Sequence, residues 1–297
     1  MQDRVIGVDL GGTKILAGLV DRDGAIEARR EVETPVRSQE ALLEALGAIV
    51  ETLLDDSVAA VGFGVPSQID QRAGRTGLAV NIPLGNLPFR DLYAQRFGRP
   101  VALENDANAA AYAEFAAGAG RGSETMAMLT LGTGVGGGIV LDGRLYRGWA
   151  EVGHLVVEYD GPPCQGSCTG RGHLESFCSG HAAGELARRL YGPPATAVEL
   201  CAAAREGDRA AADALDLLGR RLGAGIGSLV NLFDPDVVVI GGGFGVGAFD
   251  LVVPPAREVV RREALAPAGA DVRIVPATLG EDAGLVGAGL LAFDSIS

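Results

Sequence analysis

The feature that most constrains the fold is a hairpin pattern that occurs twice, about half a chain apart. An apolar run from Val5 passes through a glycine-containing loop into a second apolar run that ends at Val20, and residues 126–141 repeat this design. An Asp-Gly turn sequence follows each copy. Two β-type runs joined by a short glycine-containing loop are typical of a hairpin. One copy in each half of a 297-residue chain predicts two similar domains that face each other across a cleft.

The loops of both hairpins have a composition that suits a phosphate group. Glycines let backbone N–H groups approach a ligand closely, Thr13 and Lys14 add a hydroxyl donor and a cation, and Asp9 could hold a hydrated Mg²⁺ through water. A tight turn at a sheet corner explains the first loop equally well. Phosphate binding becomes the favoured interpretation only because the pattern occurs twice. The candidate phosphate-binding residues are Gly11, Gly12, Thr13, Lys14, Gly132, Thr133, Gly134 and Gly136.

The second loop also matches the spacing of a dinucleotide-binding fingerprint, at Gly132, Gly134 and Gly137. That fingerprint should open a helix, whereas the rest of the second apolar run, residues 139–141, and a turn follow here. We therefore reject NAD binding.

A strand–helix–strand unit follows the first hairpin and predicts a mixed sheet with a parallel part. Ser38 is the expected N-cap of a helix that reaches about Leu54, and residues 58–65 form a buried strand. The glycine- and proline-rich stretch 74–88 reads as a loop, with Asn81 at its polar tip.

A short strand then leads into Asn105-Asp106 and an alanine-rich helix. These two residues could simply cap the helix, or one could cap while the other faces a ligand at the edge of the sheet. Near the C-terminus a buried strand opens into a third glycine-rich loop at residues 241–247, a suitable place for a nucleotide base and ribose.

Composition excludes several classes of function. A net charge of −13 argues against binding to duplex nucleic acid, because neutralising phosphates requires a basic face. The chain shows neither a targeting signal nor an apolar run long enough to span a bilayer, so we expect a cytoplasmic protein without a membrane partner. Lys14 is the only lysine in the chain, which draws attention to the first loop.

Four histidines and cysteines lie close together in the sequence and could hold a metal. His154, Cys164, Cys168 and His173 provide two nitrogens and two sulfurs, a set that suits tetrahedral Zn²⁺. The alternative is two free thiols and two ordinary histidines. A loop rich in glycine and proline needs a cross-link to hold its shape, so we favour the interpretation that these four residues bind zinc. We expect Cys178 and Cys201 to be buried thiols and His181 to lie on the surface of a helix that Ser179 caps and that reaches about Tyr191.

Six motifs in this order resemble the ROK family of repressors, open-reading-frame proteins and sugar kinases, and most closely its bacterial glucokinases. They are Asp-Leu-Gly-Gly-Thr-Lys at 9–14, Glu-Asn-Asp-Ala-Asn-Ala-Ala at 104–110, Leu-Gly-Thr-Gly-Val-Gly-Gly-Gly at 131–138, Glu-x-Gly-His at 151–154, the Cys/His loop and the glycine-rich 241–245. The family's zinc loop usually carries a third cysteine where His173 stands, and Cys164 lies two residues further from Cys168 than in the family pattern.

The resemblance implies an actin/hexokinase-like (ribonuclease H-like) α/β fold of two domains with the active site in the cleft. We expect a small domain of residues 1–117 plus 280–297 and a large domain of residues 118–279 with the zinc loop. Asp106 would be the catalytic base and would also contact the sugar. The other implied sugar-binding residues are Asn81, Asn105, Glu151, His154 and Glu175. The first two glycine-rich loops would hold the ATP phosphates with Mg²⁺, and Gly241, Gly242 and Gly243 the adenosine.

The expected reaction is transfer of the γ-phosphoryl group of ATP to O6 of a hexose, most simply glucose. Kinases for mannose, fructose or N-acetylhexosamines share the scaffold, and some relatives use polyphosphate as donor. From a different class, a sugar-sensing regulator would carry an N-terminal helix-turn-helix, for which the first strand leaves no room. An actin-like ATPase or partner-binding module without a sugar would have little use for so many polar side chains. The family also implies a homodimer or homotetramer.

Overall fold

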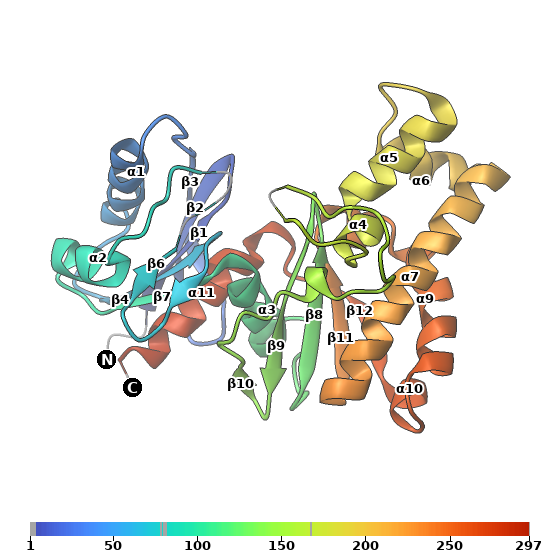
Figure 1. The fold of residues 1–297 in the computed structure, drawn as a ribbon. Helices are drawn as coiled ribbons and strands as arrows, with labels where there is room; N and C mark the ends of the chain where they lie inside the picture. Colours follow the sequence, from blue (N-terminus) through green and yellow to red (C-terminus); the bar gives the residue numbers. More distant parts are fainter. Residues whose placement is uncertain (1–3, 78, 80–81, 167, 297) are drawn as a thin grey trace. The chain divides into compact units, whose positions relative to one another are not determined.

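The chain folds into two compact units, each built on its own sheet (Figure 1). The computed structural model describes residues 4–77, 79, 82–166 and 168–296. The first unit comprises residues 1–122, 147–149 and 279–297, and the second comprises residues 123–146 and 150–278. The boundaries expected from the sequence were 117/118 and 279/280. No sequence pattern indicated the short segment 147–149, which belongs to the first unit although the chain on both sides of it belongs to the second.

The first unit has a five-stranded mixed sheet in the order β3-β2-β1-β4-β7. β1, β2 and β3 form an antiparallel meander, while β4 and β7 lie parallel to β1. A separate two-stranded ladder, β5–β6, follows β4. The bounds are Arg4–Leu10 for β1, Lys14–Val20 for β2, Ile26–Glu33 for β3, Val58–Val65 for β4, Ile69–Asp70 for β5, Arg75–Thr76 for β6 and Val101–Asn105 for β7.

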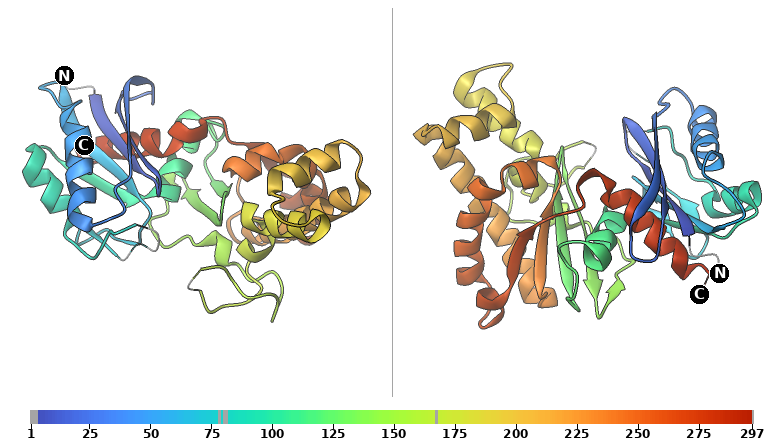
Figure 2. Two further views of the ribbon diagram at one scale, coloured as in Figure 1. Left: turned by 90° about the horizontal axis from the view of Figure 1, so that it is seen from above. Right: turned by 180° about the vertical axis from the view of Figure 1, so that it is seen from behind.

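Helices cover both faces of this sheet. One buried cluster includes residues of α1 (Gln39–Glu51) and α2 (Phe89–Phe97). The other includes residues of α3 (Asp106–Ala117) and α11 (Ala283–Asp294). Figure 2 shows the ribbon of these helices and the sheet from behind. Ser38 caps α1, as predicted, through its side chain and the Ala41 N–H. Between residue 279 and α11 lies the short 3₁₀ helix η2 (Gly280–Asp282).

α2 was missed by the sequence analysis. Its three aromatic residues, Phe89, Tyr93 and Phe97, recur every four positions and all pack around Phe63 of β4, with ring centroids 4.9–6.4 Å from it; Phe89 meets the Phe63 ring edge-on, and the other two stack on it. That spacing is the apolar stripe of a helix, and it was the available signal.

The second unit repeats the topology of the first. Its sheet has the order β10-β9-β8-β11-β12, with β8, β9 and β10 antiparallel and β11 and β12 parallel to β8. The bounds are Met126–Leu131 for β8, Val135–Leu141 for β9, Arg144–Leu145 for β10, Val237–Gly241 for β11 and Arg273–Pro276 for β12. The same strand order in both units agrees with the duplication inferred from the hairpins.

A layer of helices packs on this second sheet around one buried cluster. The long helix α7 lies against α9 so closely that Cβ atoms added at Gly219 and Gly223 would fall 2.3 and 2.5 Å from carbonyl oxygens of α9. The remaining elements are η1 (Val152–His154), α4 (Glu175–Cys178), α5 (Gly180–Tyr191), α6 (Ala197–Arg205), α7 (Arg209–Phe233), α8 (Gly243–Gly247), α9 (Phe249–Glu263) and α10 (Ala268–Asp271). Within the described ranges, we find no helix with the length and apolar character needed to cross a bilayer.

Candidate active site

Three parallel strands of the first unit, β1, β4 and β7, end at one edge of the sheet, and β1 and β7 carry carboxylates near their carboxyl ends. Asp9 of β1 pairs with Gly64 of β4, which pairs with Glu104 of β7. Asn105 and Asp106 come directly after Glu104, at the start of α3. The carboxyl ends of parallel strands are where α/β proteins bind ligands, so this edge is the candidate site of the first unit.

Asn105 caps α3 and so leaves the carboxylate of Asp106 in the first turn. The side-chain oxygen of Asn105 accepts the N–H groups of Ala107 at 3.0 Å and Asn108 at 3.1 Å. Asp106 accepts the Ala107 N–H as well, at 2.9 Å. The capping interpretation is therefore correct for Asn105, and it leaves Asp106 available for chemistry.

Two carboxyl groups at this edge have raised pKa values. Burial, and then the nearby charge of Asp106, raise the pKa of Asp9 to about 7 against a smaller lowering by Lys14. Burial also raises the pKa of Asp106, opposed by the hydrogen bond from the Ala107 N–H. The first turn of α11 closes over Asp9, since a Cβ added at Gly284 would meet the carboxylate at 2.5–2.7 Å. Such perturbed carboxyl groups are typical of functional sites.

The first glycine-rich loop is held by its own backbone and by β3. The Gly11 N–H donates to the carbonyl of Lys14 at 3.0 Å, and the hydroxyl of Thr34 donates to the carbonyl of Gly11 at 2.7 Å. A Cβ added at Gly12 would meet nothing within 4 Å, so this loop presents an open backbone. Lys14 is half-exposed and forms an ion pair with Glu281 at 2.5 Å, so its charge is already shared with a carboxylate. Sequence reasoning missed Glu281, which is 267 residues away.

The second and third glycine-rich loops meet in the second unit. β8 and β11 are parallel neighbours, and a Cβ added at Gly242 would lie 2.5 Å from the carbonyl oxygen of Leu131. The N-terminus of α5 joins them, because the Gly180 N–H donates to the carbonyl of Gly132 at 2.7 Å. Ser179 caps this helix, as predicted. Two glycine loops beside the N-terminus of a 12-residue helix offer backbone donors to an anion.

Glu175 connects the second loop to the Cys/His cluster. One carboxylate oxygen accepts the Val135 N–H at 2.9 Å, and the other lies 3.7 Å from Sγ of Cys164. Glu151 directly precedes η1, and the residue before it, Ala150, has a φ of +43°, a left-handed conformation that is uncommon for alanine. Asn81 lies outside the described residues.

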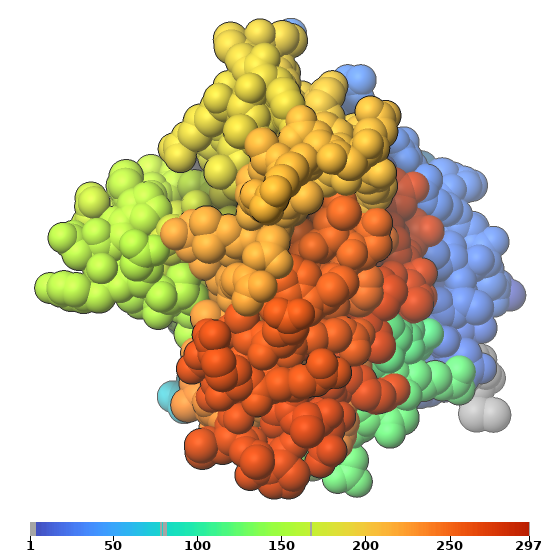
Figure 3. Space-filling model, turned by 90° about the vertical axis from the view of Figure 1, so that its right-hand side faces the viewer, coloured from blue at the N-terminus to red at the C-terminus, as the bar shows by residue number. Residues whose placement is uncertain are grey.

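His154, Cys164, Cys168 and His173 converge, as the sequence predicted. Their donor atoms all lie within 4.8 Å of one another. The two Nδ1 atoms are 3.0 Å apart, and Sγ of Cys168 is 3.8 Å from Nδ1 of His154 and 3.6 Å from Nδ1 of His173. Burial and the hydrogen bond with Cys168 raise the pKa of Cys164 to about 11, so a metal that binds here has to displace a proton. In the space-filling view, the yellow-green loop that carries Cys164 projects beside α5 and α7 (Figure 3).

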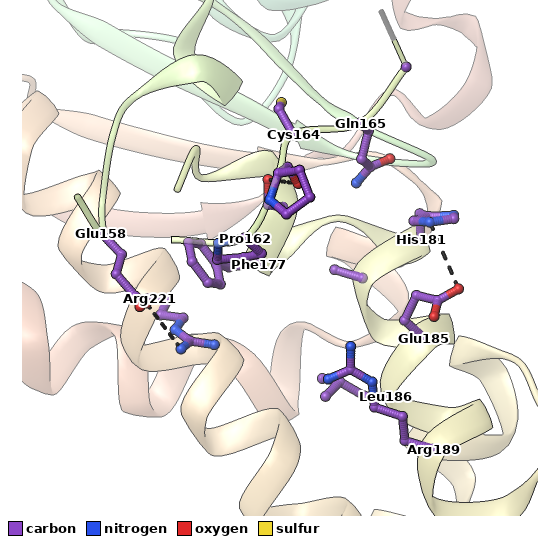
Figure 4. Close-up of a pocket in the computed structure, with 14 residues that line it drawn as sticks. Glu158, Pro162, Cys164, Gln165, Phe177, His181, Glu185, Leu186, Arg189 and Arg221 are labelled. Atoms are coloured by element: carbon purple, nitrogen blue, oxygen red, sulfur yellow. Dashed lines mark hydrogen bonds and ion pairs between the residues drawn. The ribbon is translucent and has the colours of Figure 1, made fainter. Parts of the chain in front are cut away.

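Outside this cluster, the other two cysteines and the third histidine lie where the sequence suggested. Cys178 and Cys201 are buried, and His181 is exposed on α5. His181 also lines a pocket of about 600 Å³ between the Cys164 loop, α5 and α7 (Figure 4). The guanidinium of Arg221 lies 4.2 Å from the ring centroid of Phe177 in this pocket. Of the residues expected to bind sugar, nucleotide or metal, only Cys164 lines it.

Comparison with known proteins agrees with this architecture of two duplicated α/β units with glycine loops. The model of the ROK family matches residues 5–295, so the chain belongs to the ROK family. It is 37% identical to the glucokinase of Streptomyces coelicolor, over 97% of this chain and 96% of that protein.

Two solved structures are also similar to this chain. The ROK hexokinase of Thermus thermophilus has a TM-score of 0.86 and 36% identity, and covers 99% of both chains. A ROK glucokinase from Streptomyces griseus, solved in complex with glucose and AMPPNP, has a TM-score of 0.80 and 38% identity over 98% of this chain and 99% of its own. The fold expected from the resemblance, the two-domain actin/hexokinase-like fold, is thereby confirmed.

Proposed function

We propose that this protein is an ATP-dependent hexose kinase that phosphorylates glucose at O6. The observation that carries the proposal is the junction of β7 and α3, where Asn105 is fixed as the helix cap and Asp106 follows with a raised pKa. The similarity to glucokinases, one of them bound to glucose and AMPPNP, supports the choice of sugar and donor. Mannose, fructose and N-acetylhexosamines are the alternative acceptors, and polyphosphate is the alternative donor.

In this proposal Asp106 accepts the proton of the attacking hydroxyl. A carboxylate whose pKa is raised by burial is a stronger base than an exposed one. The sugar is oriented by Asn105 and Asp106 of the first unit and by Glu151, His154 and Glu175 of the second, with Asn81 as a further contact. Phosphoryl transfer asks the protein mainly for positioning and neutralisation of charge.

The nucleotide contacts in the proposal come from the glycine-rich loops. The backbone N–H groups of loops 11–14 and 132–136 bind the phosphates, and Gly241–Gly243 lie against the adenosine. Mg²⁺, held through water by Asp9, would neutralise charge on the phosphates when bound. The ion pair between Lys14 and Glu281 implies that backbone donors and the metal carry most of this neutralisation.

We also propose that the Cys/His cluster holds a structural Zn²⁺. With Zn–N bonds of ~2.0–2.1 Å and Zn–S bonds of ~2.3 Å, a tetrahedral site separates two nitrogens by about 3.3 Å and a nitrogen from a sulfur by about 3.6 Å. The separations of 3.0 Å between the two Nδ1 atoms and 3.6 and 3.8 Å from Cys168 Sγ to His173 and His154 fit these values. The ion would tie His154 of η1 and His173, which lies two residues before α4, to the loop that carries Cys164 and Cys168. We further place the protein in the cytoplasm as a homodimer or homotetramer, with no nucleic-acid or membrane partner.

The test is a coupled ADP-release assay with MgATP against a panel of hexoses and N-acetylhexosamines. Asp106→Asn should lower kcat by ~10²–10⁴-fold, because a general base is removed. Asp213→Asn, an exposed position on α7, makes the same chemical change away from the site and should leave turnover unaltered. Near-normal activity of Asp106→Asn would refute the assignment of the base. A folded, ATP-binding protein that turns over no sugar would favour the non-catalytic regulator.

A further inference from the structure

The segment Arg147–Trp149, which we call the strap, is attached to the first unit by an ion pair. Nε of Arg147 lies 3.4 Å from Oε2 of Glu104, and its NH2 group lies 3.9 Å from Asp294. The side chain of Glu104 is only 5% exposed, whereas that of Asp294 is 58% exposed. Because water and salt screen the second pair, the contact with Glu104 is the one that holds the strap.

Glu104 also organises the residues around Asn105. Its carboxylate accepts the backbone N–H of Asn105 at 3.0 Å, the side-chain amide of Asn108 at 3.1 Å and that of Gln71 at 2.9 Å. Asn108 belongs to the first turn of α3 and is itself buried. Among the donors that the structure gives Glu104, Arg147 is the one that carries a charge. Burial raises the pKa of Glu104, and the hydrogen bonds from Asn108 and Asn105, followed by the charge of Arg147 and the hydrogen bond from Gln71, lower it.

We propose that Arg147 and Glu104 are a pair of positioning residues for the sugar. This inference rests on the proposed function. Glu104 fixes the backbone of Asn105 from one side, and through Arg147 it fixes the strap, which continues into Glu151 four residues after Arg147. The positions of two proposed sugar-binding residues, Asn105 and Glu151, therefore both depend on the carboxylate of Glu104. Asp106 has its own support in the Ala107 N–H, so the pair acts on binding of the sugar more than on proton transfer.

The experiment compares Arg147→Met with Arg144→Met, which removes the same charge from an exposed position three residues earlier. Arg147→Met should raise KM for glucose about 10- to 100-fold, the effect of a misplacement of about 1 Å, and change kcat less than threefold. Arg144→Met should match the wild type. Arg147→Lys restores a cation and should recover most of the lost affinity. A fall in kcat at constant KM would overturn the proposal.

Attachment of the strap has an independent optical readout. Trp149 is the only tryptophan of the chain, lies two residues from Arg147 and is 73% exposed. Its time-resolved anisotropy, measured without sugar, should show faster local motion in Arg147→Met than in Arg144→Met. Equal motion in both variants would show that Arg147 does not hold the strap. Faster motion with an unchanged KM would also overturn the proposal.

These readouts separate this inference from the proposed function. If the wild type phosphorylates no sugar, the proposed function fails and the role in sugar positioning fails with it. The anisotropy of Trp149 then still decides whether the ion pair holds the strap.

Discussion

Substitution of Gly287 by alanine tests the packing of α11 against α3 and the sheet of the first unit, beside the proposed active site. α11 crosses the sheet in very close contact. A Cβ added at Gly287 would lie 1.7 Å from the carbonyl oxygen of Ala109 and 2.4 Å from its carbonyl carbon. Cβ atoms added at Gly7 and Gly62 of the sheet would lie 2.0 and 1.8 Å from carbonyl oxygens of α11. No rotamer change relieves a clash with backbone, so the helix has to move by more than about 1 Å.

The magnitude follows from two opposed effects. Alanine in place of glycine in a helix interior stabilises by ~1 kcal/mol. Overpacking against a rigid neighbour costs ~3 kcal/mol, the upper end of the usual range, because the neighbour here is a main chain. We therefore expect Gly287→Ala to lower the free energy of unfolding by about 2 kcal/mol, or Tm by about 4–8 °C. Because Ala109 lies three residues after Asp106, kcat should fall as well.

Gly227→Ala is the matched control. Gly227 is also a buried glycine inside a helix, α7, but its added Cβ would meet Glu263 Cβ at 3.5 Å, an ordinary contact. This variant should gain up to ~1 kcal/mol. Scanning calorimetry and urea unfolding followed by circular dichroism measure both variants. If the Gly287→Ala variant were as stable and as active as the wild type, the close approach of α11 to α3 would be refuted.

Two further predictions concern charge and metal. Asp9 has a pKa of about 7 in the folded chain against 3.8 for an unperturbed aspartate, so between about pH 4 and 7 the folded state holds a proton that the unfolded state has lost. Without Mg²⁺ the free energy of unfolding should therefore fall as pH rises through this range, by at most ~1.4 kcal/mol per pH unit. Urea titrations should show a flatter pH dependence of this free energy for the Asp9→Asn variant. The same pH dependence in both proteins would contradict the raised pKa of Asp9. Elemental analysis should find about one zinc per chain in the wild type and in Cys201→Ser, and little in Cys168→Ser, whose second unit should also melt earlier. Unchanged zinc in Cys168→Ser would exclude this cluster as the site.

Local patterns were enough to predict most of the elements. The hairpins, the helix caps at Ser38 and Ser179, and the Cys/His cluster were all read correctly, because each depends on residues close together in the chain. The weak point was α2. The aromatic residues of this helix carry its signal, but no helix was predicted for residues 89–97.

The sequence by itself determined the duplicated architecture, since the glycine loops and the alternation of apolar runs define the strands and turns locally. It also singled out Asn105-Asp106 and the four residues of the Cys/His cluster by residue type and spacing. Only the tertiary structure decided which charges meet. Lys14 pairs with Glu281, Asp9 is perturbed by Asp106, and Glu104 receives Arg147. These partners are tens to hundreds of residues apart, and side chains so distant come together only when strands and helices pack, which no local pattern records.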